Sequence, residues 1–136
     1  MQPPGFEAFA LPLGRCAEKS SDELDQIAIP PNTKVNLNPK ELPGARETYV
    51  VPTLDGGSDT FTESLTYQWA GNGGGFSRGS TGGPHDAFGN SAPLDTDWTS
   101  PKAEKLTGPT DFTIWVVQRD ERLGVAWFEY CIRVTP

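Results

Sequence analysis

The 136-residue sequence has few of the side chains that build metal sites and redox centres. It contains two cysteines, one histidine and one methionine. With so few nitrogen and sulfur ligands, a tetrahedral metal site would need carboxylates as well, and no closely spaced pair of ligands is present. The sequence therefore predicts no bound metal ion and no cofactor.

Clustered positive charge and long apolar runs are also lacking. The 11 Lys and Arg residues are scattered through a chain of net charge -7, whereas a nucleic-acid surface needs them grouped. No apolar stretch approaches the length of a membrane-spanning helix. Residues 1–14 lack the continuous apolar core of a signal peptide, so export would depend on a leader already removed or carried by a longer precursor. The sequence predicts neither nucleic-acid binding nor a membrane span.

Turn-forming residues, by contrast, are abundant. The chain has 15 Gly and 13 Pro, which favours many short strands over packed helices. A short helical turn is expected at residues 20–23. Residues 70–93, rich in Gly, Ser, Asn and Pro, are predicted to form a long loop without regular structure. Strands are expected elsewhere, at residues 27–29, 34–37, 47–53, 65–69, 94–98, 112–118 and 125–134.

The last two of these segments are the clearest element and predict a β-hairpin. If its turn centres on Glu121, Phe112 pairs with Tyr130, and Trp115 pairs with Trp127. Trp115 and Trp127 then belong to a mixed face of the kind that is partly covered from outside. The opposite face is uninterrupted and is predicted to lie in the core: Phe112, Ile114, Val116, Ala126, Phe128 and Tyr130.

Four segments resemble the bacterial immunoglobulin-like and PKD-like repeats of cell-surface proteins: LTYQW at 65–69, GFS at 75–77, LDTDWTSP at 94–101 and IWVVQRD at 114–120. In those repeats a strand with a buried Trp precedes a Gly-rich turn, a Thr-x-Pro connection follows, and the final hairpin carries an Asp at its turn. The resemblance implies an all-β fold, an immunoglobulin-like antiparallel β-sandwich over residues 27–136. Residues 1–26 have no counterpart and are predicted to be an N-terminal extension that packs on the sandwich.

The two cysteines, Cys16 and Cys131, predict a disulfide, and two free thiols are the alternative. Cys131 shares the outer face of the hairpin with Trp115 and Trp127, so the bond would pin the extension across both tryptophans. Apolar side chains of the extension would then cover them. A disulfide would also place the protein in an oxidising, extracytoplasmic compartment.

Residues 75–79 match the Gly-x-Ser-x-Gly motif of α/β-hydrolases, with Ser77 as the nucleophile. That chemistry needs a helix after the serine, and the Gly-rich flanks exclude one. The only histidine, His85, is followed by Asp86, and two adjacent residues give poor triad geometry. We therefore expect no catalytic residues and no enzyme, and a hydrolase is the least favoured hypothesis.

Acidic residues near the expected strand ends raise the question of Ca²⁺ binding. No twelve-residue calcium loop is present, so a solvated acidic rim is the preferred interpretation. Asp120 is expected to bind backbone amides at the hairpin turn. The residues concerned are Asp95, Asp97, Asp111, Asp120 and Glu121.

Aromatic residues provide the main binding hypothesis. Trp69 is assigned to the core and Trp98 to one end of the sandwich. The candidate binding surface consists of Trp115 and Trp127, together with Phe76 and His85 of the long segment. The favoured function is a structural or interaction module of a bacterial surface or secreted assembly, with a protein partner or neighbouring subunit. The alternative is a carbohydrate-binding or adhesive domain that stacks sugar rings on exposed tryptophans.

Overall fold

A computed structural model of the chain describes residues 4–40, 48–52, 58–62, 65–83, 92–120 and 124–136. Helical turns are η1 (Cys16–Glu18), α1 (Ser21–Gln26) and η2 (Ala103–Lys105). The strands are β1 (Gly5–Ala8), β2 (Lys34–Lys40), β3 (Thr48–Pro52), β4 (Ser58–Thr62), β5 (Leu65–Gly71), β6 (Gly75–Phe76), β7 (Ser80–Gly82), β8 (Thr96–Thr99), β9 (Thr110–Asp120) and β10 (Val125–Val134).

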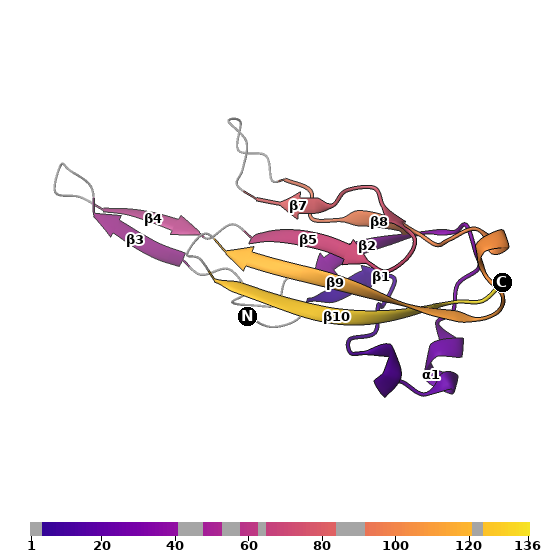
Figure 1. Cartoon of the computed structure of the whole chain (residues 1–136). Helices are drawn as coiled ribbons and strands as arrows, with labels where there is room; N and C mark the ends of the chain where they lie inside the picture. The colour runs from indigo at the N-terminus through magenta and orange to yellow at the C-terminus, as the bar shows by residue number, and fades with distance from the viewer. Residues whose placement is uncertain (1–3, 41–47, 53–57, 63–64, 84–91, 121–123) are drawn as a thin grey trace.

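Two antiparallel four-stranded sheets form a sandwich, with the strand orders β1-β2-β8-β6 and β10-β9-β5-β7 (Figure 1). Within the described residues, β3 and β4 pair with each other alone, in a ribbon that extends beyond the sandwich. The all-β sandwich predicted from the sequence is confirmed. The orders β1-β2-β8-β6 and β5-β9-β10 correspond to strands A-B-E-D and C-F-G of an immunoglobulin-type sandwich, with β7 added beside β5, and buried Trp69 lies on the strand equivalent to C.

The core lies between the inner faces of the two sheets. Both buried tryptophans satisfy their indole N–H groups, as burial requires. Trp69 Nε1 donates to Thr81 Oγ1 at 2.9 Å, and Trp98 Nε1 donates to the Gly73 carbonyl oxygen at 3.1 Å. Alternate residues of each strand point inward, giving a core that includes Leu37, Leu65, Tyr67, Trp69, Trp98, Phe112, Ile114, Val116, Tyr130, Ile132 and Val134.

The hairpin register differs from the predicted one by two residues. Trp127 lies opposite Val117, and Trp115 lies opposite Glu129, so the two tryptophans are not paired. The turn closes one residue later than predicted because Asp120 N–H donates to the Gly124 carbonyl oxygen, while Asp120 Oδ1 accepts from Gly124 N–H. A shift of two preserves side-chain alternation, so each residue keeps its predicted face. The predicted role of Asp120 as a turn residue is confirmed.

The structure corrects three predictions about secondary structure. Residues 27–29 form no strand, and only Ile29 makes an isolated bridge, with Val134. Residues 70–93 contain β6 and β7 and are therefore not a structureless loop, although 84–91 lie outside the described residues. Within the first 26 residues, β1 is a strand of the sandwich, paired with β2.

The short helix at residues 21–26 confirms the predicted helical turn. Ser20 Oγ accepts from Glu23 N–H, and the Glu23 carboxylate accepts from Ser20 N–H, both at 3.1 Å. This reciprocal capping box satisfies two backbone donors at the start of α1.

The free edge of β10 is covered by the chain's own N-terminal part. Gly14 N–H donates to the Glu129 carbonyl oxygen at 2.8 Å, and Cys131 N–H donates to that of Pro12 at 3.1 Å. Further along, Ile29 N–H donates to the Arg133 carbonyl oxygen at 3.0 Å. Covering the edge in this way blocks pairing with a foreign strand along this part of β10.

Tyr130 ties the interior of the second sheet to the start of the chain. Its buried hydroxyl donates to the Pro4 carbonyl oxygen at 2.9 Å, and its ring meets Phe6 edge-on with centroids 5.1 Å apart. Burial, with a smaller contribution from nearby Tyr67, raises the pKa of Tyr130 well above its ordinary value of 10.0. The folded protein therefore keeps this phenol protonated at a pH where the unfolded chain releases the proton.

This shift predicts alkaline destabilisation. The free energy of unfolding should fall as pH rises above about 10, because only the unfolded chain then loses the Tyr130 proton. Tyr130→Phe should lose about 1 kcal/mol at neutral pH with the hydrogen bond to Pro4. The variant should also show a shallower fall in stability between about pH 9 and pH 11. Urea unfolding across this range measures both effects, and an unchanged slope would contradict the assignment.

Candidate functional site

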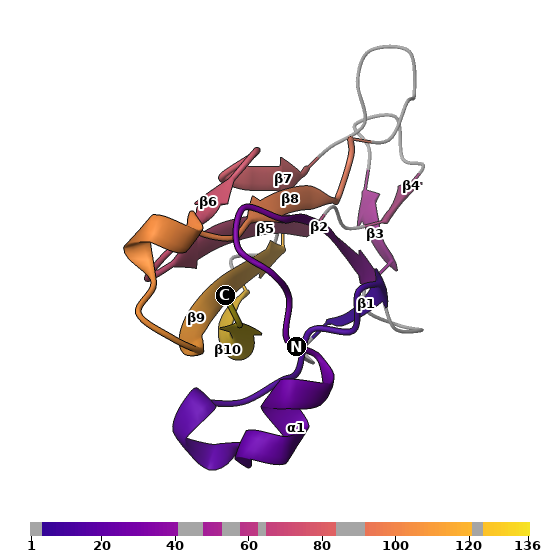
Figure 2. The same cartoon turned by 90° about the vertical axis from the view of Figure 1, so that its right-hand side faces the viewer.

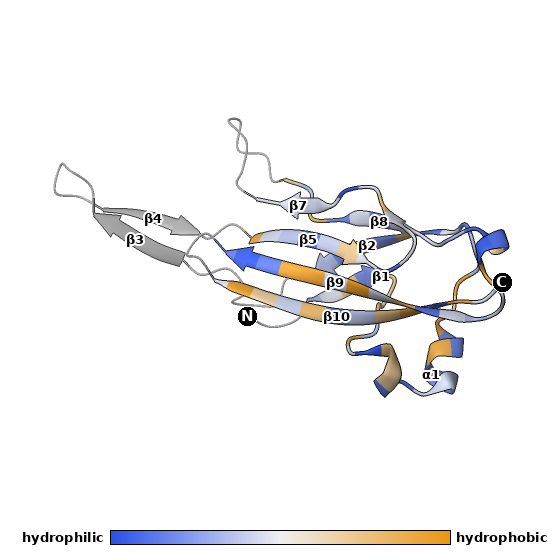
Figure 3. Ribbon diagram, viewed as in Figure 1, coloured by the Kyte–Doolittle hydropathy of each residue, from blue (hydrophilic) through white to orange (hydrophobic). Residues whose placement is uncertain are grey.

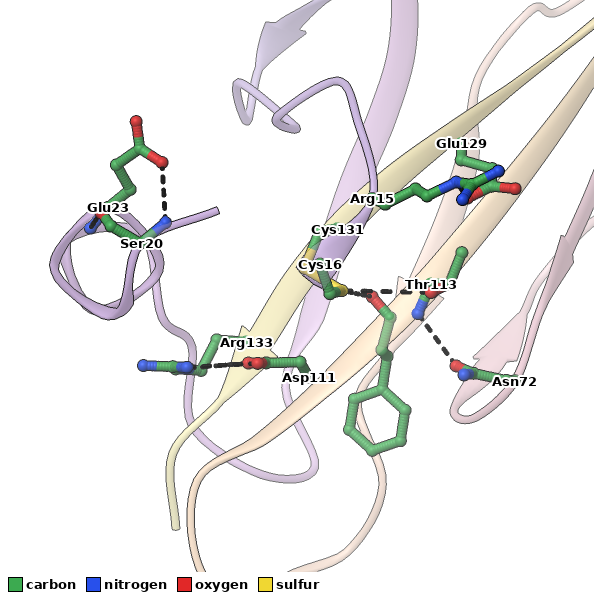
Figure 4. The surroundings of a disulfide bond; sticks show 11 residues. Arg15, Cys16, Ser20, Glu23, Asn72, Asp111, Thr113, Glu129, Cys131 and Arg133 are labelled. Carbon is green, nitrogen blue, oxygen red and sulfur yellow. Dashed lines mark hydrogen bonds and ion pairs between the residues drawn. A yellow bond between two sulfur atoms is a disulfide. The ribbon is translucent and has the colours of Figure 1, made fainter. Parts of the chain in front are cut away.

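The candidate site is the outward side of the β10-β9-β5-β7 sheet, which contains the disulfide at one end. Cys16 and Cys131 are bonded, with their Cα atoms 5.0 Å apart, so the predicted disulfide is confirmed (Figure 4). Cys131 is fully buried, and Thr113 lies opposite it on β9. The Thr113 hydroxyl lies 4.0 Å from Cys16 Sγ and is the donor in that contact, since a disulfide sulfur has no proton to give.

Arg133 holds α1 over this end of the sheet. Its guanidinium binds both carboxylate oxygens of Asp111, at 2.7 and 3.1 Å, and also Asp25 Oδ1 at 2.8 Å and Ser21 Oγ at 2.9 Å. Hydrogen bonds to Asp111, then to Asp25, raise the pKa of Arg133 above its already high ordinary value. α1 and η1 both contact β10, and α1 lies beside that strand in Figures 1 and 2.

The acidic residues considered as an alternative calcium site do not form one cluster. Asp111 binds Arg133, and Asp95 forms an ion pair with Arg78 at 3.5 Å. The Asn36 side-chain amide donates to both Asp95 and Asp97, at 2.9 and 3.0 Å. Glu121 lies outside the described residues. In the part of the chain that the structure describes, no three His, Cys, Asp or Glu side chains are grouped so as to hold a metal ion.

The extension leaves most of the outer face open, which corrects the prediction that it covers Trp127. Trp127 is 61% exposed and Val125 56%, whereas Trp115 is half-buried. The reason is the path of the chain: residues 12–14 follow the edge of β10 as far as Glu129, then turn toward Cys131. Trp127 lies four residues before Cys131, about 13 Å along the strand.

Strand pairing defines what surrounds Trp127. Val117 lies directly opposite it on β9, and the same row continues through Gln68 on β5 to Ser80 on β7. We call Trp115, Val117, Val125 and Trp127 the Trp127 face. Its margin is polar: Gln68 and Ser80 are exposed, and Glu129 forms an ion pair with Arg15 at 3.6 Å. Figure 3 shows apolar residues on β9 and β10 alternating with polar ones.

The other two residues of the predicted binding surface do not join this face. Phe76 lies on β6, in the opposite sheet, where its half-buried ring packs 6.3 Å from Trp69. His85 is outside the described residues. The structure thus places Trp115 and Trp127 on one face and separates them from Phe76.

Ser77 does not lie in a strand–serine–helix turn. Its hydroxyl accepts a hydrogen bond from Asp97 N–H at 3.0 Å, and β7 follows it in the chain. The local geometry of a hydrolase nucleophile, a serine between a strand and a helix, is therefore missing at Ser77.

Comparison with protein-family models, curated proteins and solved structures finds no significant match to this chain. Among the described residues, no helix combines the length and apolar character needed to cross a bilayer. Any functional proposal therefore depends on the geometry of the site itself.

The disulfide closes most of the chain into one loop, because the two cysteines are 115 positions apart in the sequence. Replacing both cysteines by alanine should lower the free energy of unfolding by about 4–5 kcal/mol in the chain-entropy model. Urea unfolding with and without reductant measures the effect, and the double variant serves as the control because reductant should not change its midpoint. An oxidised wild-type protein no more stable than the double variant would contradict this prediction.

Proposed function

We propose that this chain is a non-catalytic interaction module of a bacterial cell-surface or secreted assembly and that it binds its partner through the Trp127 face. The observation that carries this proposal is the 61% exposure of Trp127 on the flat side of a sheet. An indole in water beside exposed Val125 is unfavourable unless another molecule covers it. The bacterial surface or secreted setting is proposed from the sequence resemblance to immunoglobulin-like and PKD-like repeats alone, since no family model matches the chain.

The proposed compartment is extracytoplasmic. A disulfide that joins residues near the two ends of the chain persists in oxidising surroundings and is rare in the reducing cytoplasm. The bond is within one chain, so the N-terminal extension stays on its own subunit while the bond is closed. Assembly by exchange of this extension between copies is therefore not the mode we propose.

The arrangement of the Trp127 face fits a protein partner. Protein interfaces commonly have an aromatic anchor near their centre and polar residues at the rim. Trp127 provides the anchor, Val117 and Val125 extend it, and Gln68 and Ser80 supply the rim. Because residues 12–14 already pair with the edge of β10, we propose contact through the face of the sheet rather than by strand addition.

A polysaccharide is the second candidate partner, and the polar margin is the observation that favours it. An exposed indole offers a flat apolar surface to the C–H face of a sugar ring. The Gln68 amide, the Ser80 hydroxyl and the Glu129 carboxylate lie in the rows around it and could bind sugar hydroxyl groups. Under this hypothesis the protein is a carbohydrate-binding or adhesive domain that uses the same face.

Trp127→Ala tests the shared surface. It should leave the free energy of unfolding within about 0.5 kcal/mol of wild type, because the side chain is largely exposed. It should weaken binding at least tenfold, since a buried interfacial Trp typically contributes about 2 kcal/mol or more. Sedimentation measures self-association, and affinity electrophoresis in gels containing neutral polysaccharides measures sugar binding.

Leu13→Ala is the matched control, because Leu13 is also an exposed large apolar residue but lies off the Trp127 face. Sugar retardation lost only in Trp127→Ala would establish the polysaccharide hypothesis. Self-association lost only in that variant would identify a neighbouring copy as the protein partner. If the wild-type protein shows either activity and Trp127→Ala retains it in full, the assignment of the Trp127 face is wrong.

A further inference from the structure

A second surface lies on the other side of the sheet, at the end of the sandwich that holds the C-terminus and η2 (Figure 1). It is a groove of about 490 Å³, within the size range of small-molecule sites. It forms where the start of β9, the end of β8 and the turn before β6 meet. The lining residues are Asn32, Gly73, Gly74, Gly75, Thr99, Ser100, Pro101, Lys102, Lys105, Leu106 and Phe112.

The floor of the groove is apolar and firmly placed. Phe112 is a core residue, and Leu106 packs against the core. Gly74 has φ +69°, and a Cβ there would overlap the Trp98 ring and the Thr99 carbonyl oxygen. Only glycine fits such a position. At Gly74 the wall of the groove therefore consists of backbone atoms packed directly against the core. A Cβ on neighbouring Gly75 would meet nothing within 4 Å, so that position opens onto free space.

The rim of the groove is positively charged. Lys102 and Lys105 are exposed, and neither forms an ion pair or side-chain hydrogen bond with any described residue. No Asp or Glu is among the described lining residues, and exposed Glu104, between the two lysines in the sequence, does not line the groove. Two ammonium groups without a described partner beside such a groove are distinctive in a chain of net charge -7. Charge complementarity therefore points to an anion at this place.

We propose that this groove binds a small organic carboxylate with an apolar body. The carboxylate would accept charge-assisted hydrogen bonds from Lys102 and Lys105, and the apolar body would lie on Phe112 and Leu106. The proposed binding needs both sets of contacts. An inorganic anion would gain only the contacts with the lysines, and a neutral molecule only those with Phe112 and Leu106. The proposal is independent of the Trp127 face, because Phe112 points to the inner side of the sheet and Trp127 to the outer.

Phenylacetate is a suitable probe, with phenylacetamide as its neutral counterpart and inorganic phosphate as an anion without an apolar body. Titration of ¹⁵N-labelled protein should give saturable shifts at Gly73, Thr99 and Leu106. Phenylacetamide and phosphate should each bind about tenfold more weakly than phenylacetate. Added salt should weaken phenylacetate binding by screening the lysines.

Two variants test the two halves of the groove. Lys102→Gln with Lys105→Gln should raise the Kd for phenylacetate about tenfold. The control pair is Lys19→Gln with Lys40→Gln, which lie after η1 and opposite Gly5 of β1, away from the lining residues, and it should change the Kd less than about twofold. Gly75→Val should narrow the groove without unfolding β6, because Gly75 lines the groove with free space around its Cβ position and β-branched residues suit strands. It should weaken phenylacetate binding, while the rest of the spectrum reports the intact fold.

Four results with the probes and variants would overturn the proposal, and a fifth is the absence of saturable binding. The first four are equal binding of phenylacetate and phenylacetamide, an unchanged Kd in the Lys102/Lys105 variant, undiminished binding in folded Gly75→Val, and shifts outside the groove. No saturation up to about 50 mM, a concentration at which even millimolar sites are filled, would do the same. Trp127→Ala should leave this titration unchanged, so failure here and failure of the Trp127 face are distinguishable.

Discussion

The covalent bond between Cys16 and Cys131 is the constraint on which the rest of the N-terminal architecture depends. It fixes one point of the extension to the outward side of β10, in register with Thr113. From that point Arg133 orients α1 by binding Asp25 and Ser21, and residues 12–14 are drawn along the strand edge. These contacts are individually modest, but they are formed by segments that the disulfide already holds together, so little further entropy is lost in making them.

The same constraint divides the outer face into two parts. The part near Cys131 is covered by η1 and α1, and the part beyond Glu129 is left to the Trp127 face. A single bond can anchor the extension at only one position. The short segment between β1 and Cys16 runs along the edge of β10. It is therefore too short to cross the sheet toward Trp127 as well. The exposure of Trp127 therefore follows from chain length and anchoring geometry.

The sequence allowed the fold class, the disulfide and the two faces of the hairpin to be predicted, because side-chain alternation survives an error of two residues in register. The path of the extension could not be predicted, since pairing the cysteines says nothing about the direction in which the chain leaves Cys16. The groove had no local signal either. Its walls come from connecting segments that are distant in sequence, such as those of Asn32, Gly74 and Lys105, and only the closed sandwich brings them together.

The fold keeps its two candidate binding sites, the groove and the Trp127 face, physically separate. Phe112 and Val117 lie on the same strand about 17 Å apart, and because their sequence separation is odd they point to opposite sides of the sheet. A ligand in the groove would contact the inner layer at the end of the sandwich, whereas a partner on the Trp127 face would contact the outer layer nearer the hairpin turn. Any communication between them would have to pass along β9, whose inward side chains Ile114 and Val116 are fully buried. Close packing of that strand favours two independent sites over a coupled pair.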